Sequence, residues 1–600
     1  MSESSVSTEP PPSAEPPLTT ESPAVTDPIV SAARVRRFGA WYYAEHYLQS
    51  MRRYGSVILV SAIGEPLIYL LAMGLGLATL IDGGQPMAEG TSGVSYLQFI
   101  APALLAAGTL MASATEFTYP VLDGFKWHRL YYGPQASPIQ PRQIAGGHVV
   151  AVLLRYVVQS VLFFLVMLAF GGVSSPWGSL QILSACLGGL AVGLPLMAYT
   201  ATLTREGGQL SLVQRFIIMP LFLFSATFYP LDSLPVSLQW IGWISPQWHA
   251  AQLGRMASYG MANPAWLTAV HVIYLVALAV LGWCLVARTY TRRLGWVPGR
   301  PDREATGSAR RSRPERTARR RPASADVVPV PPMPPVSVRT GPAAGMYGGR
   351  ISVVVERGLK ALRTSNWAVF ISGFLEPVLY LLSLGIGLGG LVGDVEGPGG
   401  PVSYGEYIAP ALLAVSAMNG AVYDSTWNVF FKMKMSKLYE TMLNTSLGPI
   451  DVALGEITLA LMRGGLYSVA FLIIMSALGL VTSWWALLLL PAALMIAFAF
   501  ASIGMAVTSY MSTFQQMDWI TVALMPMFLF SATFFPLSVY PEPIQWAIQA
   551  LPLWHGVELL RQLGAGVFTE WTIVHLLYFA AMIGLGMLFT SRRLRALFLS

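Results

Sequence analysis

Long apolar stretches, broken by short polar segments, run along most of the chain. A helix needs about 20 mostly apolar residues to cross a lipid bilayer. The pattern therefore predicts an all-α integral membrane protein with twelve transmembrane helices. The expected spans are 57–81, 99–119, 144–170, 180–203, 213–229, 266–288, 368–392, 407–427, 452–480, 485–509, 519–535 and 572–590.

The two halves of the chain carry nearly the same sequence. Residues 219–231 read MPLFLFSATFYPL, and residues 525–537 read MPMFLFSATFFPL. The match extends through each half, since FIAPALLA at 99–106 returns as YIAPALLA at 407–414. A repeat of about 300 residues is far longer than a solenoid unit. We therefore interpret the chain as two copies of a membrane domain with six spans each.

Composition divides the chain into two membrane units and two polar segments. Residues 1–33 are rich in Pro, Ser, Thr and Glu and hold no Lys or Arg, which predicts a disordered tail. The first six-span unit is expected at 34–296 and the second at 350–600. Between them, residues 297–349 form an Arg-rich and then Pro-rich linker. It is interpreted as a solvated cytoplasmic tether, or alternatively as a cluster that holds anionic lipid headgroups.

Basic residues gather on alternate sides of the expected spans. In each half they precede span one, lie between spans two and three, and follow span six. The positive-inside rule then places both termini in the cytoplasm. Because six spans return the chain to the same side, the copies should face the same way, related by an axis along the membrane normal. Amphipathic segments at 41–48 and 353–362 suit helices that lie on the inner leaflet.

Composition also excludes several classes of protein. Apolar residues make up 54% of the chain and charged residues 11%, with a mean hydropathy of +0.56, whereas soluble domains carry about 25% charged residues. Cys186 and Cys284 lie in apolar runs, which disfavours a disulfide or a cysteine metal site. The sequence contains no GxxxxGK[ST], HExxH or GxSxG motif. We therefore expect no catalytic residue, metal or cofactor in this chain, and no nucleic-acid partner.

The segment between spans two and three is the first candidate site. KWHRLYYGP at 126–134 aligns without a gap with KMSKLYETM at 434–442. A basic cytoplasmic helix with an exposed Leu-Tyr pair suits docking into a groove on a partner, and a solvated loop is the alternative. The expected docking residues are Lys126, Arg129, Leu130, Tyr131, Lys434, Lys437, Leu438 and Tyr439.

The segment between spans five and six is the second candidate. Residues 229–265 and 536–571 are too short for two further crossings, which need about 40 apolar residues. Their prolines and tryptophans suit short helices at the outer interface. We expect a shallow re-entrant hairpin that narrows the outer end of a pathway, with an ordinary external loop as the alternative. The expected gate residues are Phe228, Pro230, Trp248, Phe534, Pro536 and Trp554.

Charged residues inside the spans are the third candidate. Such charges are costly, so they usually pair or line a wet cavity. Each copy carries an acid in span one, an acid near the inner end of span two, and an arginine in span three. We expect the arginine to pair with one of the two acids, either to lock the helices or to serve a substrate or gate. The residues are Glu65, Glu116 and Arg155 in the first copy, and Glu376, Asp424 and Arg463 in the second.

These features together resemble the permeases of type-2 ABC exporters. The block FLFSATFYPLDSLPVSLQWI…SPQWHAAQLGR after span five carries the resemblance, and it is similar to permeases of the daunorubicin-resistance and nodulation lipo-oligosaccharide export kind. The resemblance covers residues 38–296 and 350–597. It implies two separate ATPase subunits, which hold ATP and Mg²⁺ and dock near 124–135 and 432–443. Such permeases are commonly single units that dimerise, whereas this chain looks like a fused pair.

The resemblance implies a transport subunit of the cell membrane that is not itself an enzyme. Its expected cargo is an amphiphilic drug, a lipid or a lipid-linked glycan, and membrane lipids surround it. A proton-driven secondary multidrug transporter is the alternative, in which the intramembrane acids would carry protons. A membrane transferase is a weaker alternative, because the outer acids Glu542, Glu558 and Glu570 are scattered.

Overall fold

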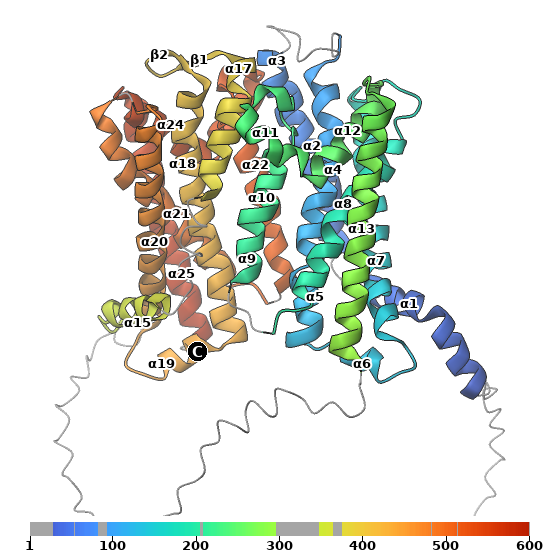
Figure 1. Cartoon of the computed structure of the whole chain (residues 1–600). Helices are drawn as coiled ribbons and strands as arrows, with labels where there is room; N and C mark the ends of the chain where they lie inside the picture. Colours follow the sequence, from blue (N-terminus) through green and yellow to red (C-terminus); the bar gives the residue numbers. More distant parts are fainter. Residues whose placement is uncertain are drawn as a thin grey trace, which may run out of the picture.

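The chain folds into two helical bundles that stand side by side (Figure 1). The computed structural model describes residues 28–52, 55–81, 93–204, 208–295, 347–363, 375–481, 483–512 and 514–598. The expected tail and nearly all of the expected linker lie outside these residues. The fold class predicted from the apolar stretches, helical and membrane-spanning, is confirmed.

The helices of the first half follow the order expected from the sequence. They are α1 (Pro28–Arg52), α2 (Gly55–Leu71), η1 (Ala72–Leu77), α3 (Ala78–Ile81), α4 (Tyr96–Glu116), α5 (Tyr119–Leu122), η2 (Asp123–Trp127), α6 (Tyr132–Gln135), α7 (Pro141–Ala169), α8 (Leu180–Thr200), α9 (Gln209–Val213), η3 (Gln214–Ile218), α10 (Met219–Leu223), η4 (Leu231–Ser233), α11 (Val236–Trp243), α12 (Pro246–Tyr259) and α13 (Ala265–Leu294).

The second half repeats this order, and its described residues include a small β-hairpin. Val395 of β1 pairs with Val402 of β2 in the antiparallel hairpin. The elements are α15 (Ile351–Arg363), η5 (Leu381–Ile386), α17 (Gly389–Val392), β1 (Asp394–Gly397), β2 (Gly400–Ser403), α18 (Tyr404–Tyr423), η6 (Asp424–Asn428), η7 (Phe431–Met435), α19 (Leu438–Leu443), α20 (Pro449–Ala477), η8 (Trp484–Leu488), α21 (Leu489–Thr508), η9 (Phe514–Met517), α22 (Asp518–Leu529), η10 (Leu537–Val539), α23 (Glu542–Gln549), α24 (Pro552–Ala565) and α25 (Glu570–Phe598).

Eight helices among the described residues are long and apolar enough to cross a membrane. Three further apolar helices, Leu67–Ile81, Gln209–Leu223 and Trp519–Leu529, are shorter. The eight are Tyr96–Trp127, Pro141–Ala169, Leu180–Thr200, Ala265–Leu294, Leu375–Val392, Pro449–Ala477, Trp484–Thr508 and Glu570–Leu597.

The fifth span of each half ends earlier than expected. α10 ends at Leu223 and α22 at Leu529, six residues before the apolar stretches end. Beyond them the backbone turns at Ala226 and Ala532, which have φ values of 55° and 56°. An L-residue pays steric strain in this left-handed region, and it interrupts a right-handed helix. The same turn in both halves therefore breaks the fifth span before it reaches its full length.

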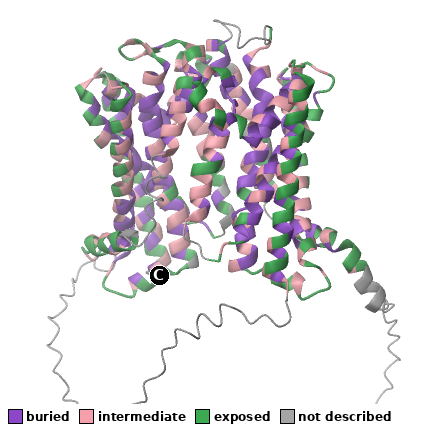
Figure 2. Ribbon diagram, in the orientation of Figure 1, coloured by how far each residue is buried: buried purple, intermediate pink, exposed green. Residues whose placement is uncertain are grey.

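Burial separates central helices from peripheral ones. In the most apolar window of Tyr96–Trp127, 78% of residues are buried, against 22% in Ala265–Leu294 and in Glu570–Leu597. Figure 2 shows exposed residues along the outer side of α13, where lipid would lie. α13 approaches α8 closely at Gly282, where a Cβ atom would lie 2.6 Å from Pro195 Cδ. Small residues allow such close contacts between helices in membranes.

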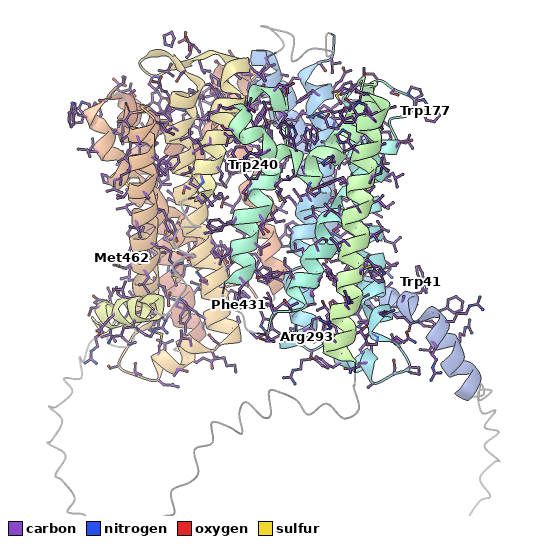
Figure 3. The ribbon with its side chains drawn as sticks, viewed as in Figure 1. Trp41, Trp177, Trp240, Arg293, Phe431 and Met462 are labelled. Atoms are coloured by element: carbon purple, nitrogen blue, oxygen red, sulfur yellow. The ribbon has the colours of Figure 1, made fainter. Side chains whose placement is uncertain are left out.

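Tryptophans mark the two ends of the bundles. Trp177 and Trp41 are exposed at opposite ends of the molecule (Figure 3). Trp484 and Trp266 are also exposed, at the starts of η8 and α13. Tryptophan favours the boundary between lipid and water. Both ends of the bundles therefore carry the side chains typical of a membrane interface.

Candidate functional site

The segments that follow α4 and α18 form matching turns at one end of the molecule. α6 and α19 lie at this end together with α1 and α15 (Figure 1), and we call it the inner end. Arg129 and Lys437 occupy equivalent positions with φ values of 53° and 49°. Both side chains are exposed. A basic side chain at a left-handed position costs conformational energy that glycine would avoid. Both copies nevertheless hold one there, which favours a functional use of the charge.

Of the Leu-Tyr pairs that were expected to be exposed, only the leucines reach the surface. Leu130 is 48% exposed, and Lys434 is also exposed. Lys126 and Leu438 are half-buried. The prediction that the tyrosines face water is wrong, because Tyr131 and Tyr439 are 1% and 2% exposed.

Packing explains the burial of Tyr131. Its ring meets Phe125 and Tyr290 edge-on, with centroid distances of 4.7 Å and 5.4 Å. Its hydroxyl lies 3.1 Å from His148 Nδ1 on α7. Burial raises the pKa of Tyr131 well above its usual value, so the hydroxyl stays neutral. This tyrosine holds the turn against the bundle and leaves Arg129 and Leu130 as the exposed surface.

The second half replaces this aromatic contact with charges. Glu456 occupies the position of His148, since both precede the matched span-three arginine by seven residues. The Glu456 carboxylate lies 2.5 Å from Lys432 Nζ in η7 and 3.7 Å from Arg357 on α15. The two inner segments are therefore anchored by different chemistry.

The inner segments of the two halves also meet each other. The rings of Trp127 and Phe431 are 6.2 Å apart, and Phe431 lies near the junction of the two bundles (Figure 3). Trp127 ends η2 and Phe431 begins η7. A displacement of one inner segment would therefore reach the other through these rings.

The structure pairs each span-three arginine with the acid of span two. Arg155 forms an ion pair with Glu116, which also accepts a hydrogen bond from Tyr47 at 3.0 Å. In the second half, Arg463 Nη1 lies 2.6 Å from Asp424 Oδ1. In both halves, therefore, the arginine of span three pairs with the acid of span two.

Among the described side chains, no acid of span one belongs to these arginine–acid pairs. The side chain of Glu65 lies outside the described part of the chain. Glu376 interacts electrostatically with Arg215, which belongs to η3 of the first half. Asp424 also feels the charge of Arg215. The second copy has Thr521 at the position equivalent to Arg215. Span five of the first half therefore brings a positive charge to span one of the second half, whereas span five of the second half has no basic residue at that position.

The turn after span five is held by a buried arginine in each half. Arg255 Nε donates to Phe99 O at 3.2 Å, and Arg255 Nη2 donates to Ala226 O at 2.6 Å. Its guanidinium carbon lies 3.7 Å from the centre of the Phe99 ring. Arg561 repeats these contacts with Tyr407 and Ala532 at the same distances.

Each arginine supplies a donor to the carbonyl of the broken turn, at Ala226 or at Ala532, which has no helical N–H donor. A second donor reaches the carbonyl of Phe99 or Tyr407 in the first turn of α4 or α18. Sequence reasoning missed these arginines, because Arg255 lies outside every expected span. α12, however, packs between α4 and α8, which buries Arg255 to 1% exposure. The signal was present in the repeat, since Trp248-His249 precedes Arg255 with the spacing that Trp554-His555 has to Arg561.

A pair of histidines lies beside each arginine. His249 Nδ1 and His271 Nδ1 are 2.7 Å apart, as are His555 Nδ1 and His575 Nδ1. His249 Nε2 lies 3.0 Å from Trp243 O and donates to it. His249 Nδ1 therefore accepts, and His271 Nδ1 carries the proton that is shared. The expected gate residues Phe228, Pro230, Phe534 and Trp554 are buried in this region, and Trp248 and Pro536 are half-buried.

The two halves touch along a seam between span five of one and span one of the other. Tyr229 lies against Gly387, where a Cβ atom would be 2.5 Å from the tyrosine ring. Its hydroxyl lies 2.6 Å from Ser383 Oγ, and Ser383 Oγ donates to Leu223 O at 2.7 Å. At the equivalent contact, Phe535 lies against Gly76.

No group of three or more His, Cys, Asp or Glu side chains that could hold a metal ion occurs in the described ranges. The features that the structure gathers are the inner basic turns, the paired intramembrane charges and the arginine-held outer turns. All three occur once in each half.

A family model for the ABC-2 type transporter matches the chain twice, at residues 41–259 and 350–564. Nodulation protein J of Rhizobium leguminosarum bv. viciae is 33% identical over 228 residues, which is 38% of this chain and 85% of the relative. Nodulation protein J of Rhizobium meliloti (strain 1021) is 30% identical over 215 residues, which is 36% of this chain and 80% of the relative. The two separate matches confirm the tandem duplication that the sequence predicts.

Proposed function

The chain belongs to the ABC-2 type transporter family, and from this premise we propose that it is the membrane-spanning subunit of an ATP-driven exporter. The observation that carries the proposal is the repetition of the whole family domain, which puts a basic turn around Arg129 and another around Lys437 at the same end of the molecule. One chain then supplies both docking sites of a transporter that uses two ATPase subunits. Those subunits bind ATP and Mg²⁺ and hydrolyse the nucleotide.

We further propose that each half crosses the plasma membrane six times, with both termini in the cytoplasm. The shorter helices Leu67–Ile81, Gln209–Leu223 and Trp519–Leu529 supply incomplete spans. α11 with α12, and α23 with α24, form re-entrant hairpins behind the turns at Ala226 and Ala532. Support comes from the way α12 packs between α4 and α8, since an ordinary external loop would remain outside the bundle.

The proposed cargo is an amphiphilic molecule, because the chain is rich in apolar residues and poor in charge. Proton-driven transport is less well supported, because the acids of span two that would carry protons, Glu116 and Asp424, form ion pairs with arginines of span three. ATP closure of the two ATPase subunits is expected to move the inner turns, and the contact of Trp127 with Phe431 would couple them.

The test is the ATPase activity of a complex between this chain and a co-expressed ATPase subunit. Arg129→Glu combined with Lys437→Glu should lower complex formation and vanadate-sensitive ATPase activity at least about tenfold, because each reversal turns an attraction into a repulsion. Lys360→Glu, an exposed change on α15 at the same end, is the control and should leave both intact. Unchanged activity in the double variant, or cargo transport that persists under vanadate but stops with an uncoupler, would contradict the proposal.

A further inference from the structure

A cavity of about 430 Å³ lies in the second half, beside the β1–β2 hairpin, α24 and the start of α25. These elements lie at the end opposite the inner turns (Figure 1). A cavity of this size is within the range that holds a small organic ligand. Trp554, Trp571, Glu396, Glu558, Arg561 and His575 are among the residues that line it.

Two tryptophans form a corner of this cavity. The rings of Trp554 and Trp571 are 6.3 Å apart and nearly perpendicular, at 85°. Trp554 is buried, whereas Trp571 is 52% exposed at the end of the molecule. Indole faces carry negative electrostatic potential and attract cations.

Two carboxylates and one imidazole nitrogen of the lining accept no hydrogen bond within the described part of the chain. Among the described residues, none donates a hydrogen bond to the carboxylates of Glu396 or Glu558; the nearest charge to Glu558 is Arg561 Nη1 at 3.9 Å. His555 Nε2 donates to Gln549 O, so its Nδ1 accepts the proton of His575 Nδ1. This leaves His575 Nε2 as a fully buried acceptor without a donor in the structure.

Most of the hydrogen-bond donors of Arg561 point away from the carboxylates. Its Nε and Nη2 donate to the carbonyls of Tyr407, Ala532 and Thr533, and its guanidinium stacks on the Tyr407 ring. These contacts hold the outer turn, as those of Arg255 do in the first half. Two carboxylates therefore face the cavity with at most one weakly directed counter-charge.

The first half differs from the second at two of these positions. Gln252 stands in place of Glu558, and Leu267 in place of Trp571. The Glu558 carboxylate and the Trp571 ring are thus present in one copy and replaced in the other, although the arginine and histidine pairs are common to both. The shared groups serve the fold, and the differing ones distinguish a site.

We propose that this cavity binds the ammonium group of an organic cation. The ammonium would face the Trp554 and Trp571 rings and pair with Glu558 and Glu396. The cation is either a free amphiphilic amine or the headgroup of an aminolipid. The site does not depend on the partner ATPase, so its test is separate from that of the proposed function.

The experiment measures binding of radiolabelled phenethylamine to the full chain in nanodiscs of phosphatidylglycerol, with empty nanodiscs as the blank. Glu558→Gln and Trp571→Leu, which install side chains typical of the first half, should each weaken binding about 3- to 30-fold. Glu396→Gln is the second carboxylate variant. Glu542→Gln, an exposed acid on α23 outside the cavity lining, is the matched control and should bind as the parent does.

Phenethyl alcohol, which has the same shape without the charge, should fail to displace the probe. Apparent affinity that falls in phosphatidylethanolamine nanodiscs identifies a headgroup as occupant, and unchanged affinity identifies a free amine. Unchanged binding in all three cavity variants, with thermal unfolding intact, overturns the proposal. Equal displacement by the alcohol also overturns it.

Discussion

At the residue scale, the buried arginines are the least expected feature of the molecule. Arg255→Met removes the donors to Phe99 O and Ala226 O, and it leaves the carbonyl of Ala226, which lies in the turn outside any helix, buried without a partner. An orphaned group costs about 1–3 kcal/mol. We therefore expect a large loss of stability, measured as a lower midpoint of thermal unfolding in detergent.

Arg255→Lys keeps the charge and one donor, so it should lose less than the methionine variant. Arg292→Met is the control, because Arg292 is exposed in the last turn of α13 and surface changes usually alter stability by less than about 0.5 kcal/mol. If Arg255→Met and Arg292→Met melt at the same temperature, the arginine does not hold the turn.

Single residues also show how far the sequence could be interpreted. Pairing of Arg155 with an acid followed from the cost of an isolated charge in lipid, and the structure selects Glu116. The burial of Tyr131 could not be predicted, because its segment is polar and the residues that cover it, such as His148 on α7 and Tyr290 on α13, lie far away in the sequence. Local patterns thus predict which groups need partners, and tertiary packing decides which partners they find.

At the element scale, apolar stretches predicted most helices well but not where the fifth spans end. MPLFLFSATFYPL is apolar throughout, so nothing in its hydropathy marks the turn at Ala226. The turn becomes stable because α12 brings Arg255 to its carbonyl. The amphipathic helix α15 was predicted from its charge pattern, and it packs against α20.

The contact between α15 and α20 is close enough to test. A Cβ atom on Gly455 would lie 2.5 Å from the Val354 side chain, so Gly455→Ala should push α15 away from α20. We expect Val354→Cys, buried in the parent, to become several-fold more reactive to maleimide in a background without Cys186 and Cys284. Gly464→Ala is the matched control on the same helix, since its Cβ would meet no atom within 4 Å. Equal labelling in both glycine variants would show that α15 does not depend on this contact.

At the scale of the whole molecule, duplication has produced two halves with the same fold but an unequal seam. Ser383 and Ala72 are equivalent, since each follows the span-one glutamate by seven residues, and Tyr229 and Phe535 are equivalent in the longest repeat. One side of the seam therefore carries two hydroxyls, and the other side carries neither. Arg215 adds a charge facing Glu376 on the side with the hydroxyls. The sequence alone could not indicate this, because the two pairs come together only when the halves dock.

The hydroxyls of Tyr229 and Ser383 should act as a unit. Hydrogen bonds between helices in membranes contribute about 0.6–2 kcal/mol, and the Tyr229 and Ser383 oxygens are 2.6 Å apart with Leu223 O as a shared acceptor. In a double-mutant cycle of Tyr229→Phe and Ser383→Ala, unfolding in SDS should show a coupling energy in that range. Tyr229→Phe with the distant Ser502→Ala should be additive within about 0.5 kcal/mol. Additivity in the first cycle as well would mean that the two hydroxyls contribute independently. A measured coupling would mean that the side of the seam formed by Tyr229 and Ser383 resists separation more than the side formed by Phe535 and Ala72. Any opening between the halves should then begin at the side of Phe535 and Ala72.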